Sequence, residues 1–406
     1  MKGKKKLFIT IPAIVTGIVI ALVSVGALTL VKEREKQVAE WNEIQRFCFS
    51  KDIEFGEDSI NLTYDEIKEY KPRRDIYNSK IYYNALTEKE KVVYNALEYA
   101  FDHNYVYIFV DEEILADADY TLENIVDFMA LDSPFLQQNV DWELYDFEMT
   151  FTEFIVFKPE SKSVKGDTFA VKNFSAARTK AVQKAVDTAS KWKLDFSKDA
   201  TDVEKARAIY KYVDENIEYG SEDVDRTLNY LCTAVAGETN CDGFANIYSL
   251  LCNINGLKCF EKYSLASEGE DNGHTWNTVL LSGEWYNVDC TPARENKIEG
   301  AMEIMRFGYS DDLQLDKPEY ADVFPKSTEN ITPVSGCFDA CSSENALSDI
   351  CDAFEESETD YIIVAFEVFD EDECDLFQKV ANRIYRDIDI VTLYGDKLTL
   401  CYIKAE

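Results

Sequence analysis

The sequence predicts an α+β protein in which a helix carrying a cysteine packs on an antiparallel sheet, with an N-terminal transmembrane helix and a small C-terminal α+β module. Three observations predict this class. Helix-period patterns with capping signals alternate with short strand patterns along the 406 residues. Residues 274–291 have the pattern of a hairpin, and one long apolar run lies near the start. The length suggests two or three domains, and 46% hydrophobic residues suffice for a core.

The amino end is basic and then apolar. Residues 1–6 contain four lysines, and residues 7–31 form a run of 25 residues without charge. A helix of this length extends roughly 37 Å, enough to cross a hydrocarbon core of about 30 Å. The preceding lysines predict a single-pass protein of the cell membrane with a cytoplasmic N-terminus and an extracytoplasmic remainder. A cleaved signal peptide, ending near Ala27, is the alternative, and it also exports the domain.

Charge and histidine content exclude several functions. The net charge is −35, and because residues 1–36 carry +5, the remainder carries −40. Such acidity excludes nucleic acid as a partner, which needs a basic surface. Two histidines exclude a multi-histidine metal site. The chain contains no calcium-binding loop motif and no pair of C-x-x-C motifs for zinc, so we expect neither a metal nor a cofactor.

Helix and strand patterns then follow in order. Residues 32–60 are charged, and their first part has the pattern of a helix. Together these features predict a stalk. Thr87 and Glu90 form a capping-box pattern at the start of a helix, and a strand pattern (YVYIFV) follows it. Further helices are expected at 120–131, 175–192 and 202–217, strands at 142–158, and a helix–strand–helix–hairpin order at the C-terminus. The predicted segments are a basic tail (1–6), a transmembrane helix (7–31), a stalk (32–85), an N-terminal α+β region (86–160), a catalytic domain (161–323), a linker (324–343) and a C-terminal module (344–406).

Cys241 stands at the predicted start of a buried helix. Apolar residues recur at helical spacing from Phe244, and Gly256 lies where the helix should end. Thr239 and Asn240 are candidate N-cap residues. The unpaired amides and the positive end of the helix dipole stabilise a thiolate at such a position. The same position is also compatible with an ordinary apolar or disulfide-bonded cysteine.

A predicted β-hairpin brings His274 and Asp289 together. With its turn at Ser282-Gly283, paired residue numbers sum to 565, so Trp276 lies opposite Asp289. His274 and Asp289 then project from one face as diagonal neighbours, about 7–8 Å apart at the backbone. A carboxylate so placed can hold one imidazole nitrogen and leave the other for a thiol. An incidental pair on a half-exposed hairpin is the alternative.

These segments resemble a known family. The resemblance is carried by the runs CDGFA (241–245), GHTWN (273–277) and WYNVDCT (285–291), which look like the three signature blocks of the transglutaminase-like superfamily. The helix end at 216–219 and the run 307–311 resemble its bacterial branch. The resemblance covers residues 200–315 well and says nothing about 344–406.

The resemblance implies a transglutaminase/papain-like core with a Cys-His-Asp triad. Cys241 is then the nucleophile, His274 the general base and acid, and Asp289 the orienting carboxylate. The family works through a thioester that an amine or water attacks. Thr275 replaces the usual alanine of the second block, and Cys290 is expected to point away from the face that carries Asp289. The Cys241 amide is one expected oxyanion donor.

The remaining candidates are assigned structural roles. His103 lies far from any motif and is expected to be structural or solvated. Ten cysteines remain besides Cys241, and in an exported domain they can form up to five disulfides or remain core residues. Cys337 and Cys341 are close enough in sequence for a local bridge.

The sequence therefore predicts an extracytoplasmic transglutaminase-like cysteine peptidase or acyltransferase that acts on peptide or protein amides. Its location favours hydrolysis or transpeptidation of surface or cell-wall peptides over glutamine–lysine crosslinking. The rival hypothesis is a non-catalytic binding or scaffold module at the cell surface. The presence of all three triad residues argues against it, because a decayed site is expected to have lost one.

Overall fold

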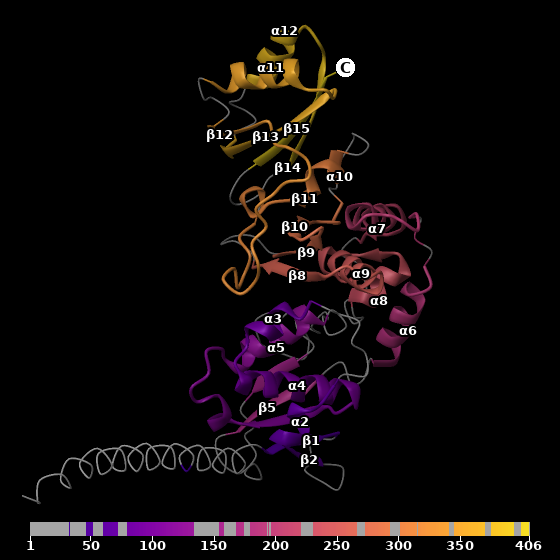
Figure 1. Ribbon diagram of the computed structural model, residues 1–406, viewed down its shortest axis with the longest axis vertical. Helices are drawn as coiled ribbons and strands as arrows, with labels where there is room; N and C mark the ends of the chain where they lie inside the picture. The colour runs from indigo at the N-terminus through magenta and orange to yellow at the C-terminus, as the bar shows by residue number, and fades with distance from the viewer. Residues whose placement is uncertain are drawn as a thin grey trace, which may run out of the picture.

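The computed structural model shows three layers of elements along its long axis (Figure 1). Among the residues that it describes, no helix is both long and apolar enough to cross a membrane. The predicted tail and transmembrane helix, residues 1–31, lie outside the described residues. The described residues are 32, 46–51, 60–71, 79–133, 154–157, 168–173, 179–192, 194, 196–220, 230–265, 273–292, 301–314, 316–340, 345–369, 375–393 and 399–405.

The N-terminal layer is a five-stranded sheet with the strand order β2-β1-β3-β5-β4, covered by helices. Its β1 and β2 come from the predicted stalk, and Phe47 and Phe49 of β1 are fully buried. Residues 46–51, 60–71 and 79–85 are therefore part of the folded structure, which corrects the stalk over those residues. β5 lies beyond residue 160, so this layer extends further than predicted. The elements are β1 (Arg46–Ser50), β2 (Ile60–Thr63), α2 (Tyr64–Lys68), α3 (Ile81–Ala85), α4 (Glu88–Asp102), β3 (Tyr107–Asp111), α5 (Leu122–Asp132), β4 (Phe154–Phe157) and β5 (Thr168–Asn173).

The middle layer pairs a four-stranded antiparallel sheet, β11-β10-β9-β8, with a group of helices. Helix α9 lies against β8 and β9 (Figure 1). Asn277 of β9 donates a hydrogen bond to the carbonyl of Ala245 in α9, 3.0 Å away. The elements are α6 (Thr179–Ala189), α7 (Asp202–Asn216), β6 (Glu218–Tyr219), α8 (Tyr230–Ala236), β7 (Glu238–Thr239), α9 (Cys241–Ile254), β8 (Cys259–Ser264), β9 (His274–Leu281), β10 (Glu284–Val288), α10 (Ala301–Arg306) and β11 (Phe307–Tyr309).

The C-terminal layer is a second four-stranded sheet, β12-β13-β15-β14. The predicted order of helix, strand, helix and two antiparallel strands is observed. One strand was not expected: β12 lies in the predicted linker and pairs in parallel with β13. The predicted Gly-Asp turn lies outside the described residues. The elements are β12 (Gly336–Ala340), α11 (Ala346–Glu356), β13 (Tyr361–Val368), α12 (Leu376–Ile384), β14 (Ile388–Leu393) and β15 (Thr399–Ala405).

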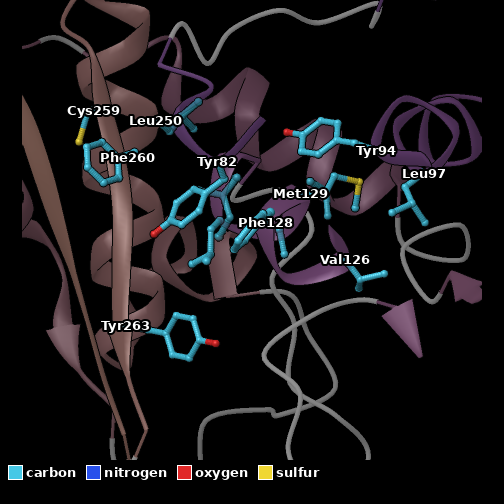
Figure 2. Close-up of a cluster of buried hydrophobic side chains, with 14 of the residues drawn as sticks. Tyr82, Tyr94, Leu97, Val126, Phe128, Met129, Leu250, Cys259, Phe260 and Tyr263 are labelled. Carbon is cyan, nitrogen blue, oxygen red and sulfur yellow. The ribbon is translucent and has the colours of Figure 1, made fainter. Parts of the chain in front are cut away.

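The first two layers share one hydrophobic core, and Tyr82 is central to it. Its ring lies 5.2 Å from that of Phe128 in α5 and 6.2 Å from that of Phe260 in β8, measured between centroids (Figure 2). The Tyr82 hydroxyl donates to the backbone carbonyl of Glu261, 2.8 Å away. Because Glu261 lies in β8, the N-terminal layer holds the sheet of the middle layer in place.

Candidate active site

Cys241 is the first residue of α9, as the sequence predicts. Asn240 is the N-cap: its side-chain oxygen accepts from the Gly243 amide at 3.3 Å, and its carbonyl accepts from the Phe244 amide. The amides of Cys241 and Asp242 precede that first intrahelical bond and belong to the positive end of the helix. The thiol therefore lies beside backbone donors that can stabilise negative charge.

The start of α9 can lie this close to Thr239 of β7 because residue 243 is a glycine. A β-carbon built at residue 243 would lie 1.8 Å from the Thr239 hydroxyl oxygen and 2.7 Å from the Thr239 β-carbon. Thr239 is fully buried, and its hydroxyl pairs with that of Thr233 at 2.7 Å, so it has no room to move. The glycine of the C-x-G pattern thus has a steric reason that the sequence does not reveal.

The hairpin has the predicted register. Leu281 pairs with Glu284 and Val288 with Asn277, and the turn residues Ser282 and Gly283 have φ angles of +53° and +101°. Asp289 follows the last residue of β10. The structure brings His274 and Asp289 into contact, with 2.8 Å between Nε2 and Oδ2.

The His274 ring connects the carboxylate to the thiol. A carboxylate only accepts hydrogen bonds, so Nε2 carries the proton in this contact and Nδ1 is left for Cys241. The imidazole also interacts with the Cys241 thiol, and each group shifts the pKa of the other: the ring acts to lower that of the thiol, and the thiol to raise that of the ring. Cys241 is half-buried, the His274 side chain is 25% exposed, and that of Asp289 is 7% exposed. The nucleophile and base are thus reachable while the orienting carboxylate is enclosed.

The three groups shift one another's pKa values. Burial would lower the pKa of His274, but the adjacent Asp289 carboxylate outweighs it and raises the pKa well above the usual value. Burial would raise the pKa of Asp289, but the Arg306 and His274 cations hold it well below its usual range. Burial and the neighbouring Asp242 raise the pKa of Cys241, against the opposing effect of the His274 hydrogen bond. Both partners of the thiol–imidazole pair therefore hold their protons more tightly than isolated groups.

A hydrogen bond between Thr275 and Asp242 joins the helix end to the strand. The Thr275 hydroxyl donates to Asp242 Oδ1 at 2.6 Å, and Asn240 Nδ2 donates to Oδ2 at 3.1 Å. The Thr275 backbone amide also acts to lower the pKa of the Cys241 thiol. Thr275 stands where this chain departs from the family pattern. Its side chain links β9, directly after His274, to α9, directly after Cys241.

Arg306, at the end of α10, is a site residue that sequence reasoning missed. Its Nη1 lies 2.9 Å from Asp289 Oδ2, the same oxygen that faces His274. The other carboxylate oxygen, Oδ1, accepts the Thr291 amide at 2.9 Å. Arg306 stands directly before the run 307–311, which resembles the family. This adjacency was the only sequence signal for Arg306, and it does not indicate a contact with Asp289.

The other candidates lie outside this arrangement. His103 caps α4, where its Nδ1 lies 2.8 Å from the Tyr99 carbonyl and its ring stacks on Tyr99. Cys290 is buried in the main core with Cys252 and Cys259, so it is directed away from the triad face. No disulfide joins two cysteines of the described ranges. No cluster of metal ligands occurs within the same ranges. Cys341 lies outside them.

Comparisons with known proteins point to one superfamily. The profile of the transglutaminase-like superfamily matches residues 191–290, which contain Cys241, His274 and Asp289. Kyphoscoliosis peptidase from Homo sapiens is 31% identical over 105 residues, 22% of this chain, and the Mus musculus protein is 30% identical over the same length. The match spans 16% of each of these relatives. A solved TGase structure shares 14% identity over 37% of this chain and 48% of its own, with a TM-score of 0.21. Through the profile match, residues 191–290 of this chain are a transglutaminase-like superfamily domain, and part of the chain is distantly similar to kyphoscoliosis peptidase.

Proposed function

We propose that the protein is a cysteine enzyme that acts on peptide or protein amide bonds through a thioester on Cys241. The observation that carries this proposal is the position of the His274 ring, whose Nε2 lies 2.8 Å from the Asp289 carboxylate and which acts to lower the pKa of the neighbouring Cys241 thiol. A nucleophile, a base within reach of it and a group that orients the base are the elements of nucleophilic catalysis.

In the proposed reaction, each proton transfer involves a specific atom. His274 Nδ1 takes the Cys241 proton, and the thiolate attacks the amide carbonyl carbon. The resulting oxyanion forms near the helix-terminal amide of Cys241. As the carbon–nitrogen bond breaks, His274 returns the proton to the leaving amine, and a thioester remains. Water then yields hydrolysis, and a second amine yields acyl transfer.

We infer an extracytoplasmic location, with residues 7–31 as a single membrane anchor. This inference is supported by the 25 uncharged residues after four lysines. The substrates are then peptides or proteins outside the cytoplasm, cell-wall peptides among them. A net charge of −40 after residue 36 favours neutral or cationic segments over anionic polymers.

A non-catalytic scaffold is the competing function, and one observation favours it. Burial and the adjacent Asp242 raise the pKa of Cys241, whereas many reactive thiols have a lowered pKa. The two functions differ in whether His274 activates the thiol.

Iodoacetamide labelling of the full chain, followed residue by residue with mass spectrometry, tests this. Cys232 on the neighbouring α8 is also half-buried and serves as the internal reference. We expect Cys241 to label at least about tenfold faster than Cys232 near pH 8, His274→Ala to abolish the difference, and Cys290→Ala to leave it unchanged. Equal rates at Cys241 and Cys232 would overturn the assignment. Fluorescent casein and a biotinylated alkylamine then separate hydrolysis from acyl transfer.

A further inference from the structure

We propose that Arg306 is a positioning residue for the triad, and that the C-terminal sheet holds Arg306 in place. Arg306 is not one of the three residues to which the superfamily resemblance assigns a role. The proposal rests on the proposed function, because it concerns how Asp289 and His274 support Cys241. It also gives a role to the C-terminal module, which the matched profile does not cover.

The contacts of Arg306 are directed at the Asp289 segment. Its Nη1 lies 2.9 Å from Asp289 Oδ2 and also donates to the Thr291 carbonyl. The Asp289 amide in turn donates to the Arg306 carbonyl at 2.9 Å. The side chains are 15% and 7% exposed, so solvent screens this pair less than a surface ion pair. Arg306 therefore fixes both the direction of the carboxylate and the course of the backbone after it.

The shared oxygen couples Arg306 to His274. Asp289 Oδ2 contacts His274 Nε2 at 2.8 Å and Arg306 Nη1 at 2.9 Å. The guanidinium cation therefore opposes a second positive charge on the ring, and it lowers the pH at which the Cys241–His274 pair loses its first proton. The other titratable groups around the triad and Arg306 include Asp242 on α9, Tyr230 on α8, Tyr210 on α7, Tyr309 on β11 and Cys290 after β10.

The C-terminal sheet packs against the helix that carries Arg306. Ala301 and Met305 of α10 are buried in one cluster with residues of that sheet. In Figure 1, α10 lies between the middle layer and β14 and β15. The sheet residues in this cluster are Ile363, Ala365, Leu393, Leu400 and Tyr402. Because the cluster occupies one face of the helix, the module limits the orientations that the helix end can take.

A second contact of α10 supplies a matched control. Glu303 pairs with Arg207 of α7 at 2.6 Å and with Lys211 at 3.5 Å. Arg207→Gln removes an ion pair of the same helix that involves neither Asp289 nor His274. Any effect of Arg306→Gln that Arg207→Gln reproduces is a general effect on the helix.

The test is the pH dependence of Cys241 labelling by iodoacetamide in the full chain. We expect Arg306→Gln to move the acid limb to higher pH, with labelling about tenfold slower below the limb. Arg306→Lys, which keeps the charge, should stay near the wild type, and so should Arg207→Gln. An unshifted limb in Arg306→Gln, or an equal shift in Arg207→Gln, overturns the role of Arg306. A thermal melt of each variant accompanies the profile.

A pair of leucines tests the role of the module. Leu400 of β15 is buried on the face of the sheet that packs on α10. Leu376, the first residue of α12, is buried against the opposite face of the sheet. Leu400→Ala should shift the limb in the same direction as Arg306→Gln, and Leu376→Ala should lower stability without a shift. Identical profiles for the two variants overturn the module's role.

The proposed function and the role of Arg306 are overturned by different results. If wild-type Cys241 labels no faster than Cys232, the proposed function falls and this inference with it. If wild-type and His274→Ala proteins behave as expected while Arg306→Gln matches the wild type, only the inference falls. A variant that does not fold is replaced by Arg306→Lys in an Asp289→Asn background, where the proposal expects no further shift.

Discussion

Asp289→Asn removes the negative charge that supports His274 and keeps the shape of the side chain. Asp289 Oδ2 lies 2.8 Å from His274 Nε2, and the residue is 5% exposed. The substitution also leaves Arg306, 2.9 Å from the same oxygen, without its anionic partner. The variant therefore tests whether the carboxylate acts through its charge.

The size of the effect follows from Coulomb's law. Two unit charges about 4 Å apart at an effective dielectric constant of about 20 interact by about 4 kcal/mol. The His274 side chain is 25% exposed, and if solvent screening leaves about half of this interaction, about 2 kcal/mol of support for the imidazolium is lost in the variant. Since 1.4 kcal/mol corresponds to a factor of ten, the thiolate–imidazolium pair should become about 30-fold less populated.

Iodoacetamide labelling of Cys241 across pH 5–10 measures this population. We expect a plateau rate about 30-fold lower and an acid limb shifted to lower pH, because the carboxylate is what raises the pKa of His274. Asp289→Glu, which retains the charge, should keep more of the rate than Asp289→Asn. A plateau labelling rate within about twofold of the wild-type rate would refute the claim that the charge of Asp289 supports the imidazolium.

Three further predictions concern Gly243 and Thr275 beside the triad and Asp127 on α5 of the N-terminal layer. Gly243→Ala should lower the free energy of unfolding by about 1–3 kcal/mol in urea titration, because its methyl group would overlap Thr239; an unchanged midpoint would contradict the steric reading. Thr275→Val should slow Cys241 labelling several-fold by losing the donor to Asp242, and Thr275→Ser should restore it; equal rates in both variants would show that the hydroxyl is dispensable. Burial raises the pKa of Asp127 to about 6, so the folded state binds its proton more tightly, and its contribution to stability declines as pH rises from about 4 to 6. Unfolding midpoints of Asp127→Asn should lack this decline, and a parallel pH dependence in both proteins would count against the assignment.

Local features of the fold were predictable from the sequence. The capping box at Thr87, the start of α9 at Cys241 and the hairpin register between 277 and 288 all match the structure. Each depends on residues within about ten positions of one another, through hydrogen bonds and side-chain periodicity that the sequence displays directly.

Assignments that depend on distant partners were not predictable. β1 becomes a strand because it pairs with β2 and with β3, whereas the charged, helix-like run that precedes it suggested a stalk instead. β12 lies in a proline- and glycine-containing stretch and becomes a strand because β13 offers it a parallel edge. In both cases, the tertiary neighbours outweigh the local composition.

The sequence by itself determined which residues can form the Cys241–His274–Asp289 line, because the helix start and the hairpin register are local. Only the tertiary structure decided what encloses that line. The contact of Arg306 with Asp289, the bond from Thr275 to Asp242 and the packing of the C-terminal sheet on α10 all join segments distant in the chain. The physical reason is that charge, burial and steric exclusion depend on distance in space, and periodicity along the sequence carries no record of that distance.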